Sequence, residues 1–376
     1  MKTQFKRKLS LACMICLIGF WTQSAFAATD AELEQRIAAL EEELKTRTES
    51  PLGALTDKIT LSGAIELDYS YSDDADTGDK TSKSSESDLS LGTIELGLEA
   101  NLHPYVTANV LLKGEDLDSD DKVFFDEAFF TIAKDGMPVY FIGGKRCQPF
   151  GVYESLFIND PVTQDLYEVN KTGATLGYAD ENLMGLDVSF TLYRGRTLVE
   201  KINDADYGVT FPTTKDSDSV NSFIVNAGIA PAEGLHLSAF FNSEPGDNDR
   251  NTTMGAAAHW DFGNFIADVE YISALNRDKD TAGKEYNEKA WTASLGYQVA
   301  EPLLLAVRYE GFDPDKNTDG SLDSRYSLGA TYTLFSQDSM ACNLMGEYRH
   351  TKYDVVSGST KDDKLNEFFA RLALEF

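Results

Sequence analysis

The chain has 376 residues, of which 33 are basic and 62 are acidic, so its formal net charge is −29 at pH 7. An acid excess of this size argues against nucleic-acid binding, because a phosphate backbone needs a basic surface. Past the amino terminus, no apolar segment reaches the length of a membrane-spanning helix, so any passage through a membrane must use strands.

The first 27 residues have the parts of a secretory signal peptide. Four basic residues between positions 2 and 8 precede an apolar run over residues 9–20, and Ala25, Phe26 and Ala27 form an A-x-A cleavage site. We therefore expect the mature chain to start at Ala28. It would carry 29 basic and 62 acidic residues, a net charge of −33.

Residues 28–50 have a helical period. Their apolar residues are spaced four, three and four apart, at Leu33, Ile37, Leu40 and Leu44. This spacing is typical of the d and a positions of a coiled coil, and the sequence RIAALE from Arg36 resembles a trimer-favouring pattern. Two heptads are marginal as an isolated helix. We interpret the segment as a periplasmic stalk on a barrel that forms a homotrimer, or else as a lone amphipathic helix.

From residue 51 onward, the hydrophobic pattern repeats every two residues. Apolar residues from Ile59 to Tyr71 alternate with polar residues from Thr60 to Ser70, which predicts a strand with one apolar face. The same rule predicts sixteen strands, which begin near residues 58, 88, 104, 122, 137, 171, 184, 218, 234, 252, 264, 288, 302, 322, 338 and 364. The fold class expected for residues 51–376 is an all-β, transmembrane antiparallel β-barrel preceded by the short coiled-coil helix.

Short and long connections alternate strictly between these strands. The long, polar connections cover roughly residues 72–87, 116–121, 147–170, 197–217, 245–251, 277–287, 313–321 and 351–363. Short periplasmic turns and long external loops are typical of a barrel in the outer membrane of a Gram-negative bacterium, and an even number of strands leaves both termini in the periplasm. The bulky strand faces would then contact outer-membrane lipid and lipopolysaccharide.

The last strand, residues 367–376, has an apolar face and ends on Phe376. We expect it to close the barrel against the first strand, and its ending resembles the address that the bacterial barrel-assembly machinery reads. The alternative is a last strand buried in a soluble sandwich. Cys147 and Cys342 fall near opposite ends of their strands, so no disulfide is expected between them.

The connection from 147 to 170 is the longest of those predicted, and it is too apolar for a purely solvated loop. Its apolar residues need a surface to pack on, and the inner wall of a sixteen-strand barrel provides one. We therefore expect an inward-folded loop. Its candidate pore-constriction residues are Phe150, Glu154, Asp160, Asp165 and Glu168.

Inward and outward positions alternate along each strand, and this strand parity also predicts the charged residues of the pore wall. The last four strands contribute Arg308, Arg325, Arg349 and Arg371, and the first two contribute Glu66, Asp68, Glu95 and Glu99. A basic wall opposite acidic loop residues would create a transverse field that filters charge. Alternatively, these arginines and carboxylates pair with each other across the wall.

Catalytic and metal-binding functions have little support. The histidines at 103, 236, 259 and 350 are scattered, and no serine or cysteine lies in a nucleophile motif, so an enzyme or a cofactor is not expected. Residues 313–321 carry alternating carboxylate and amide side chains, but Gly320 is misplaced for an EF-hand and no Glu closes the site. We interpret this segment as a solvated loop that could bridge lipopolysaccharide through divalent cations.

The order of parts resembles the LbtU family of siderophore porins. The resemblance rests on the barrel opening ITLSGAIELDYSY, on the sequence GGKRCQPFGVYESLFINDPVTQDLYE and on the terminal Phe. Its most specific piece is Pro149, Phe150 and Gly151, followed by Asp160, Pro161, Leu166 and Glu168. A similar PFG after a Gly-Lys strand occurs in phosphate- and carboxylate-selective porins.

The resemblance implies a porin that passes a ferric siderophore across the outer membrane without a plug domain. Two alternatives stay open on the sequence. One is a general or small-anion diffusion porin, and the other is a structural tether whose stalk contacts the cell wall.

Overall fold

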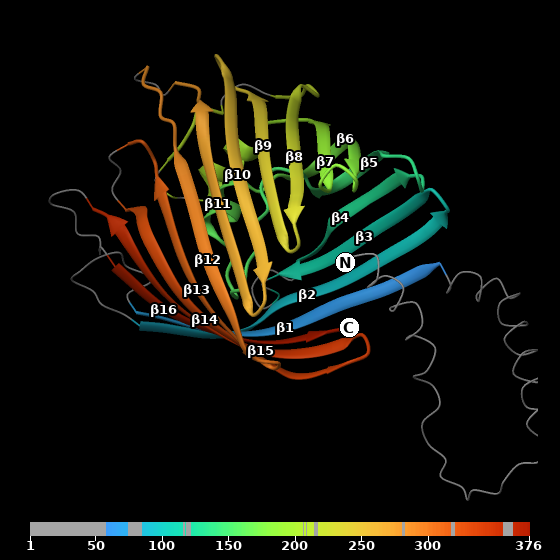
Figure 1. The fold of residues 1–376 in the computed structure, drawn as a ribbon. Coiled ribbons are helices and arrows are strands. Elements are labelled where there is room, and N and C mark those ends of the chain that lie inside the picture. Colours follow the sequence, from blue (N-terminus) through green and yellow to red (C-terminus); the bar gives the residue numbers. More distant parts are fainter. Residues whose placement is uncertain are drawn as a thin grey trace, which may run out of the picture.

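The computed structural model describes residues 58–73, 85–115, 117, 122–205, 207, 209–213, 217–279, 283–316, 320–355 and 364–376 (Figure 1). The expected signal peptide (1–27) and coiled coil (28–50) lie outside these residues.

The described residues form sixteen strands that pair in chain order. They are β1 (Ile59–Asp73), β2 (Ser85–His103), β3 (Val106–Glu115), β4 (Lys122–Ala133), β5 (Val139–Cys147), β6 (Asn170–Asp180), β7 (Leu186–Tyr193), β8 (Ser222–Ala232), β9 (Leu235–Pro245), β10 (Arg250–Phe262), β11 (Phe265–Asn276), β12 (Lys289–Ala300), β13 (Leu303–Asp313), β14 (Ser321–Gln337), β15 (Met340–Asp354) and β16 (Lys364–Glu375). All neighbours are antiparallel, and β1 pairs with β16, so the barrel is closed. The predicted antiparallel β-barrel is confirmed, and each strand begins within four residues of its expected position.

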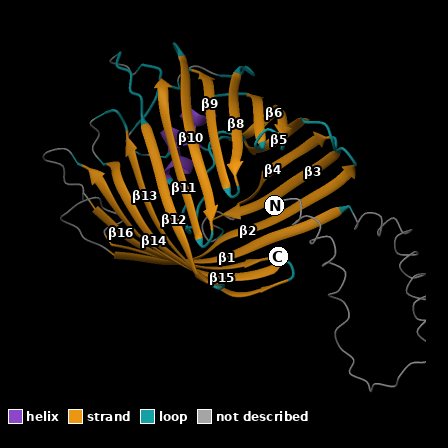
Figure 2. Cartoon of the chain, in the orientation of Figure 1, coloured by secondary structure: helices purple, strands orange, loops and turns teal. Residues whose placement is uncertain are grey.

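Two short helices lie in connections between strands. Helix α4 (Val162–Tyr167) follows β5, and helix α5 (Thr197–Asp204) follows β7. They contact each other, and α4 also contacts β11, β12 and β13, so both lie inside the ring of strands (Figure 2). None of the helices in the described ranges, these two included, has the length and apolarity needed to span a membrane.

The connections differ in length at the two ends of the barrel, as expected. One exception is the connection at 245–251, which was predicted to be long. Here β9 ends at Pro245 and β10 begins at Arg250, so only residues 246–249 connect them. Gly246 N donates to Asp249 O at 2.8 Å, which closes a tight turn.

The outer face of the barrel is apolar. On β1, Leu61 and Leu67 point outward and are exposed, whereas Glu66 and Asp68 point inward and are half-buried. At the end with the short turns, a continuous row of rings crosses β10, β11 and β12, with centroid separations of 4.4, 5.3 and 4.8 Å along Trp260, Phe262, Phe265 and Tyr297. An apolar band bounded by aromatic rings suits a lipid environment.

The seam between β1 and β16 depends on the last residue. Phe376 N donates to Gly63 O at 3.0 Å, and Gly63 N donates to Phe376 O at 2.8 Å. The Phe376 ring lies over Gly63, where an added Cβ would come within 2.5 Å of the ring and 2.7 Å of the Glu95 carbonyl oxygen. The seam therefore needs both the terminal residue and a glycine opposite it.

Deletion of Phe376 should weaken this seam, because it removes the two backbone hydrogen bonds to Gly63 and one lipid-facing ring. After refolding in micelles, we expect a smaller fraction of the chain to migrate as the heat-resistant folded form in SDS electrophoresis. Phe265→Leu, which changes another exposed phenylalanine away from the seam, is the control and should keep the wild-type fraction. An unchanged fraction for the deleted chain would show that closure does not need the last residue.

Candidate functional site

Residues 148–169, between β5 and β6, cross the barrel interior and pack on its opposite wall. Phe150 is fully buried against Phe240 of β9, with ring centroids 5.0 Å apart. Farther along, the Leu156 and Phe157 side chains lie over Gly296 of β12 and Gly329 of β14. These glycines leave the depressions in the wall that receive the loop.

Buried carboxylates on the wall bind the backbone of this loop. Glu270 of β11 accepts from Val152 N at 2.7 Å, and Glu347 of β15 accepts from Asn159 N at 3.0 Å. Glu347 also accepts from Asn159 Nδ2 at 3.0 Å. An N–H group in a loop has no strand partner, so a charged acceptor on the wall satisfies it and fixes the path of the loop.

A third carboxylate holds the start of α4. Glu310 of β13 is fully buried and accepts from Val162 N, the first helical residue, at 2.6 Å. The helix has no side-chain N-cap, because Pro161 precedes it. Glu310 therefore supplies from the wall the acceptor and the negative charge that favour a helix N-terminus.

Arg308 lies under the loop and does not face the open lumen, in contrast to the expectation that it lines the pore. It is 3% exposed, pairs with Glu310 at 3.0 Å and with Glu347 at 3.4 Å, and donates to Asn159 O at 2.9 Å. The Phe157 ring covers its guanidinium at 4.5 Å. Strand parity predicted its inward direction, but two carboxylates of the wall pair with its charge and the loop covers it.

A second connection also packs inside the barrel, although residues 197–217 were expected to form an external loop. Glu244 of β9 accepts from Leu198 N at 2.9 Å and Val199 N at 3.3 Å, at the start of α5, and from the Tyr193 hydroxyl at 2.6 Å. Both loops share one apolar cluster with the wall, comprising Phe150, Val162, Leu166, Tyr167, Val169, Tyr193, Leu198, Val199, Ile202, Val209, Phe211, Ile224, Phe240, Ile272, Ala290, Phe312 and Leu322. The barrel interior thus has a packed core along β7 to β14.

Polar contacts join the two inner loops. Lys201 of α5 binds Glu168 at 3.0 Å, and the Tyr207 hydroxyl donates to Asp165 at 3.0 Å. Arg325, 5% exposed on β14, donates to the Tyr207 hydroxyl at 3.4 Å. Burial raises the pKa of Tyr207 to about 12, so this hydroxyl stays protonated and bridges the loop to the wall. Arg325, like Arg308, is therefore occupied by loop contacts.

The two remaining predicted wall arginines pair locally. Arg371 of β16 binds Glu66 at 2.9 Å and Asp68 at 2.7 Å, both on the adjacent β1. Arg349 binds Glu367 at 2.7 Å between β15 and β16. This is the pairing that was left open as the alternative to separate basic and acidic walls.

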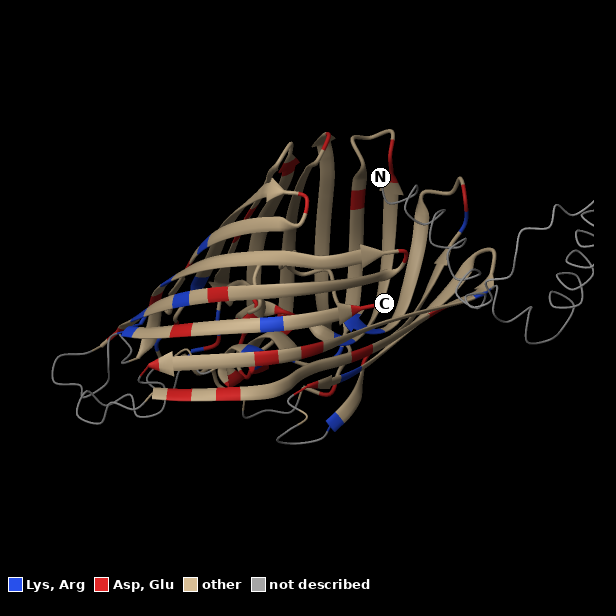
Figure 3. Cartoon of the chain, turned by 90° about the horizontal axis from the view of Figure 1, so that it is seen from below, with Lys and Arg blue, Asp and Glu red and all other residues tan. Residues whose placement is uncertain are grey.

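The side of the barrel formed by β16, β1, β2 and β3 is less filled. Arg371, Glu66, Asp68, Glu95 and Glu99 are all half-buried there. Lys113 of β3 lies between Glu95 at 3.6 Å and Glu115 at 2.7 Å. Acidic and basic positions recur along these strands (Figure 3). These inward-facing charges lie on the side of the barrel away from the packed core.

The acidic residues of the loop differ in exposure. Glu154 and Asp160 are exposed, and Asp165 and Glu168 are half-buried. Asp160 lies within electrostatic range of Lys113 and of Arg371. Of the expected constriction residues, Phe150 alone is fully buried, so it anchors the loop and does not border the passage.

Within the described residues, the histidines and cysteines do not gather into a second site of three or more side chains. His236 and His259 are cross-strand neighbours on β9 and β10, while His103 and His350 lie on β2 and β15. The described part of the chain holds no group of three or more His, Cys, Asp or Glu side chains that could bind a metal ion. Cys147 and Cys342 are free thiols. The 313–321 segment lies partly outside the described residues.

Sequence reasoning missed the four carboxylates that hold the loops: Glu244, Glu270, Glu310 and Glu347. Each lies on the inward face of a strand, and each is 3% exposed or less. Their signal in the sequence is an acidic residue at an inward position of β9, β11, β13 or β15, the strands opposite the inward-folded loop. Parity shows which way such a residue points but not what covers it.

A closed barrel with an inner loop and a charged opening defines a porin-type channel. The Gram-negative porin family matches residues 16–356, so this chain belongs to that family. It is an outer-membrane porin.

The chain is also similar in sequence to two UPF0422 proteins. A UPF0422 protein of Coxiella burnetii is 24% identical over 323 residues, which cover 80% of this chain and 67% of the relative. A UPF0422 protein of Legionella pneumophila strain Paris is 22% identical over 61% of this chain, and the match spans about half (48%) of that relative's length.

Solved structures share the fold at low sequence identity. An anion-selective porin from Comamonas acidovorans has a TM-score of 0.59 at 11% identity, over 85% of this chain and 99% of that one. OmpF of Salmonella typhi in complex with daunomycin has a TM-score of 0.58 at 12% identity, over 85% and 97%. The trimer form of Vibrio cholerae OmpT has a TM-score of 0.56 at 13% identity, over 85% and 99%.

Glu347→Ala should loosen the loop, because it leaves Asn159 N without its acceptor and Arg308 with one carboxylate fewer. Breaking a buried ion pair in this way costs about 3 kcal/mol. We expect a lower midpoint of thermal unfolding in micelles and larger current fluctuations in single-channel recordings. Glu99→Ala removes one lumen carboxylate that does not contact the loop, and is the matched control. Current fluctuations of equal size in the two variants would contradict the idea that Glu347 holds the loop in place.

Proposed function

We propose that this porin is a passive diffusion channel that prefers small cations. Solutes would pass through the off-centre opening between residues 148–169 and the inner faces of β16, β1, β2 and β3. The observation that carries the proposal is the charge around this opening. Carboxylates at 66, 68, 95, 99, 154, 160, 165 and 168 outnumber the cations at 113, 201 and 371.

The ion pairs of the wall arginines leave this excess of negative charge in place. Arg308 and Arg325, which could have favoured anions, are buried beneath the loops. Arg371 is shared between Glu66 and Asp68, so that cluster keeps a net negative charge. A narrow passage with an excess of fixed carboxylates concentrates cations and repels anions. The Comamonas porin is described as anion-selective, and the opposite preference of this chain follows from its own residues.

Membrane orientation and assembly complete the proposal. Both termini lie in the periplasm, the long connections face outward, and residues 28–50 form a stalk after cleavage of residues 1–27. Three copies associate, as in the trimer form of Vibrio cholerae OmpT. The C-terminal strand with Phe376 is what the barrel-assembly machinery reads.

Passage of a ferric siderophore is the more specific alternative, suggested by the resemblance of residues 143–168 to siderophore porins. The two inner loops occupy much of the interior, which leaves less room for a bulky ligand. A structural tether is a further alternative, and it needs no open channel. Electrical and uptake measurements separate the three.

Asp160→Lys should reduce the cation preference, because it places a positive charge beside Lys113 and Arg371 at the opening. In a planar bilayer with a potassium chloride gradient, we expect the reversal potential to move toward the anion side. Glu181→Lys makes the same charge change in the exposed turn between β6 and β7 and should leave the reversal potential near that of the wild type. If both variants shifted the potential equally, Asp160 would not border the passage. No current from the refolded wild-type chain would favour the tether.

Deletion of the gene distinguishes diffusion from siderophore transport. The proposal predicts slower entry of small cationic solutes and unchanged uptake of ferric siderophore. The complemented strain carrying the wild-type chain is the control. Loss of ferric-siderophore uptake, with normal entry of small amino acids and sugars, would establish the siderophore function instead.

A further inference from the structure

Two histidines lie opposite each other on neighbouring strands, inside the end of the barrel that has the short turns. His236 follows the first residue of β9, His259 lies near the end of β10, and the two are direct partners in the antiparallel pairing. Their sequence neighbours Leu237 and Trp260 are exposed on the outer surface. Because side chains alternate along a strand, both imidazoles point toward the lumen.

A carboxylate fixes the orientation of one imidazole. His259 Nδ1 and Asp268 Oδ1 lie 2.5 Å apart, and Ser294 Oγ donates to the other oxygen of Asp268 at 3.1 Å. Asp268 and Ser294 are both buried. A carboxylate that accepts from Nδ1–H leaves the lone pair of the neutral imidazole on Nε2.

These residues form one row across the inner wall. The register pairs His236 with His259, His259 with Asp268, and Asp268 with Ser294, from β9 to β12. Histidine ligands of metal ions are commonly held in this way, by a carboxylate that accepts from the second ring nitrogen and is itself hydrogen-bonded. His259 and Asp268 alone would be an ordinary polar pair of the wall. The second imidazole on the same face adds a second metal ligand.

The two imidazoles are close enough to share one metal ion. Their ring centroids are 6.2 Å apart, with an angle of 41° between the ring planes. Two imidazoles on one ion, at metal–nitrogen distances of about 2.0–2.1 Å, have centroids roughly 5–6 Å apart. His236 is exposed, and the second side-chain torsion of histidine has a broad range, so a small rotation brings the rings to this separation.

Carboxylates beside the pair favour a cation. Asp261 Oδ2 lies 3.4 Å from His259 Nε2, and Asp268 lies at the other nitrogen of the same ring. Asp261 is exposed, so it can also contact water bound to an ion. The next residue of the row is Arg308, whose charge is already paired with two wall carboxylates.

We propose that His236 and His259 bind one divalent ion of the late first transition series, such as Cu²⁺, Ni²⁺ or Zn²⁺, in this mouth of the pore. Imidazole nitrogen suits these ions, whereas Mg²⁺ and Ca²⁺ prefer oxygen ligands. In the described part of the chain no third His, Cys, Asp or Glu side chain completes the group, so water fills the other coordination positions. A structural zinc site has four protein ligands, and a site with two holds its ion exchangeably. The site does not depend on the charge preference proposed for the passage.

Isothermal titration calorimetry with Ni²⁺ tests the site on the porin extracted from membranes into micelles, without a histidine tag. Cys147 is replaced by Ser in every chain, because a thiol also binds these ions. We expect saturable binding that excess Mg²⁺ does not displace. His236→Ala should remove this binding. Asp268→Asn should weaken it roughly 10- to 100-fold, the usual effect of losing the carboxylate behind a histidine ligand.

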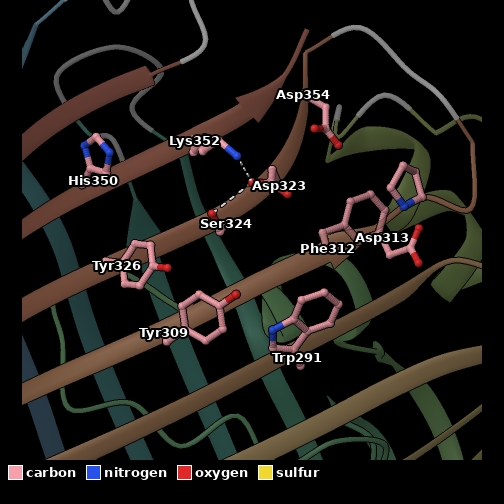
Figure 4. Close-up of a pocket in the computed structure, with 11 residues that line it drawn as sticks. Trp291, Tyr309, Phe312, Asp313, Asp323, Ser324, Tyr326, His350, Lys352 and Asp354 are labelled. Atoms are coloured by element: carbon pink, nitrogen blue, oxygen red, sulfur yellow. Dashed lines mark hydrogen bonds and ion pairs between the residues drawn. The ribbon is translucent and has the colours of Figure 1, made fainter.

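His350→Ala is the matched control. His350 of β15 lies on the outer surface near the long connections, in a groove that Tyr326 and Lys352 also line (Figure 4). Its Nδ1 lies 2.7 Å from Asn366 Oδ1, so this imidazole also has one nitrogen occupied. The variant removes a histidine away from the lumen pair and should bind Ni²⁺ as the parent chain does. The heat-resistant folded form in SDS electrophoresis shows that each variant is intact, whether or not it conducts.

Three results would overturn the proposal. Folded His236→Ala could bind Ni²⁺ as tightly as the parent chain, or His350→Ala could lose as much binding as His236→Ala. Alternatively, Mg²⁺ could displace Ni²⁺ at equal concentration, which would assign the binding to carboxylates. A porin that passes no current but binds Ni²⁺ through His236 would refute the channel and support the site.

Discussion

The interior of this porin depends on carboxylates of the barrel wall that accept hydrogen bonds from loop backbone. Glu270, Glu310 and Glu347 hold residues 148–169, and Glu244 holds the start of α5. Strands satisfy their own backbone groups, whereas a loop inside a barrel has no such partners. A buried carboxylate provides a strong acceptor at a fixed height on the wall. These wall carboxylates thus position the inner loops and do not line a pore.

This arrangement fills one side of the barrel. The two inner loops build an apolar core with β7 to β14, and Arg308 and Arg325 are buried beneath them. What remains exposed toward the lumen is mostly acidic, because Arg371 is shared by two carboxylates and the loop adds Glu154 and Asp160. In the proposed channel, the charge of the passage therefore depends on which arginines the loops cover, and not on the number of arginines in the wall.

Much of the fold could be predicted from the sequence, because a barrel strand has a strict period of two and its ends coincide with changes in loop polarity. The direction of Arg308 was predictable for the same reason, but its burial was not, since parity carries no information about a segment 150 residues away. The inward packing of α5 was also missed. Its signal was present in Leu198, Val199 and Ile202, which share one helical face within a mostly polar segment.

Residue-resolved amide hydrogen exchange, measured by NMR on the porin in micelles, tests the central claim most directly. The amides of Val152, Asn159, Val162 and Leu198 bond to carboxylates and not to a neighbouring strand. The account predicts that they exchange as slowly as amides in the adjoining strands, and that Glu→Gln at the matching wall position accelerates only the partner amide. Exchange of all four at the rate of an unstructured loop would contradict it.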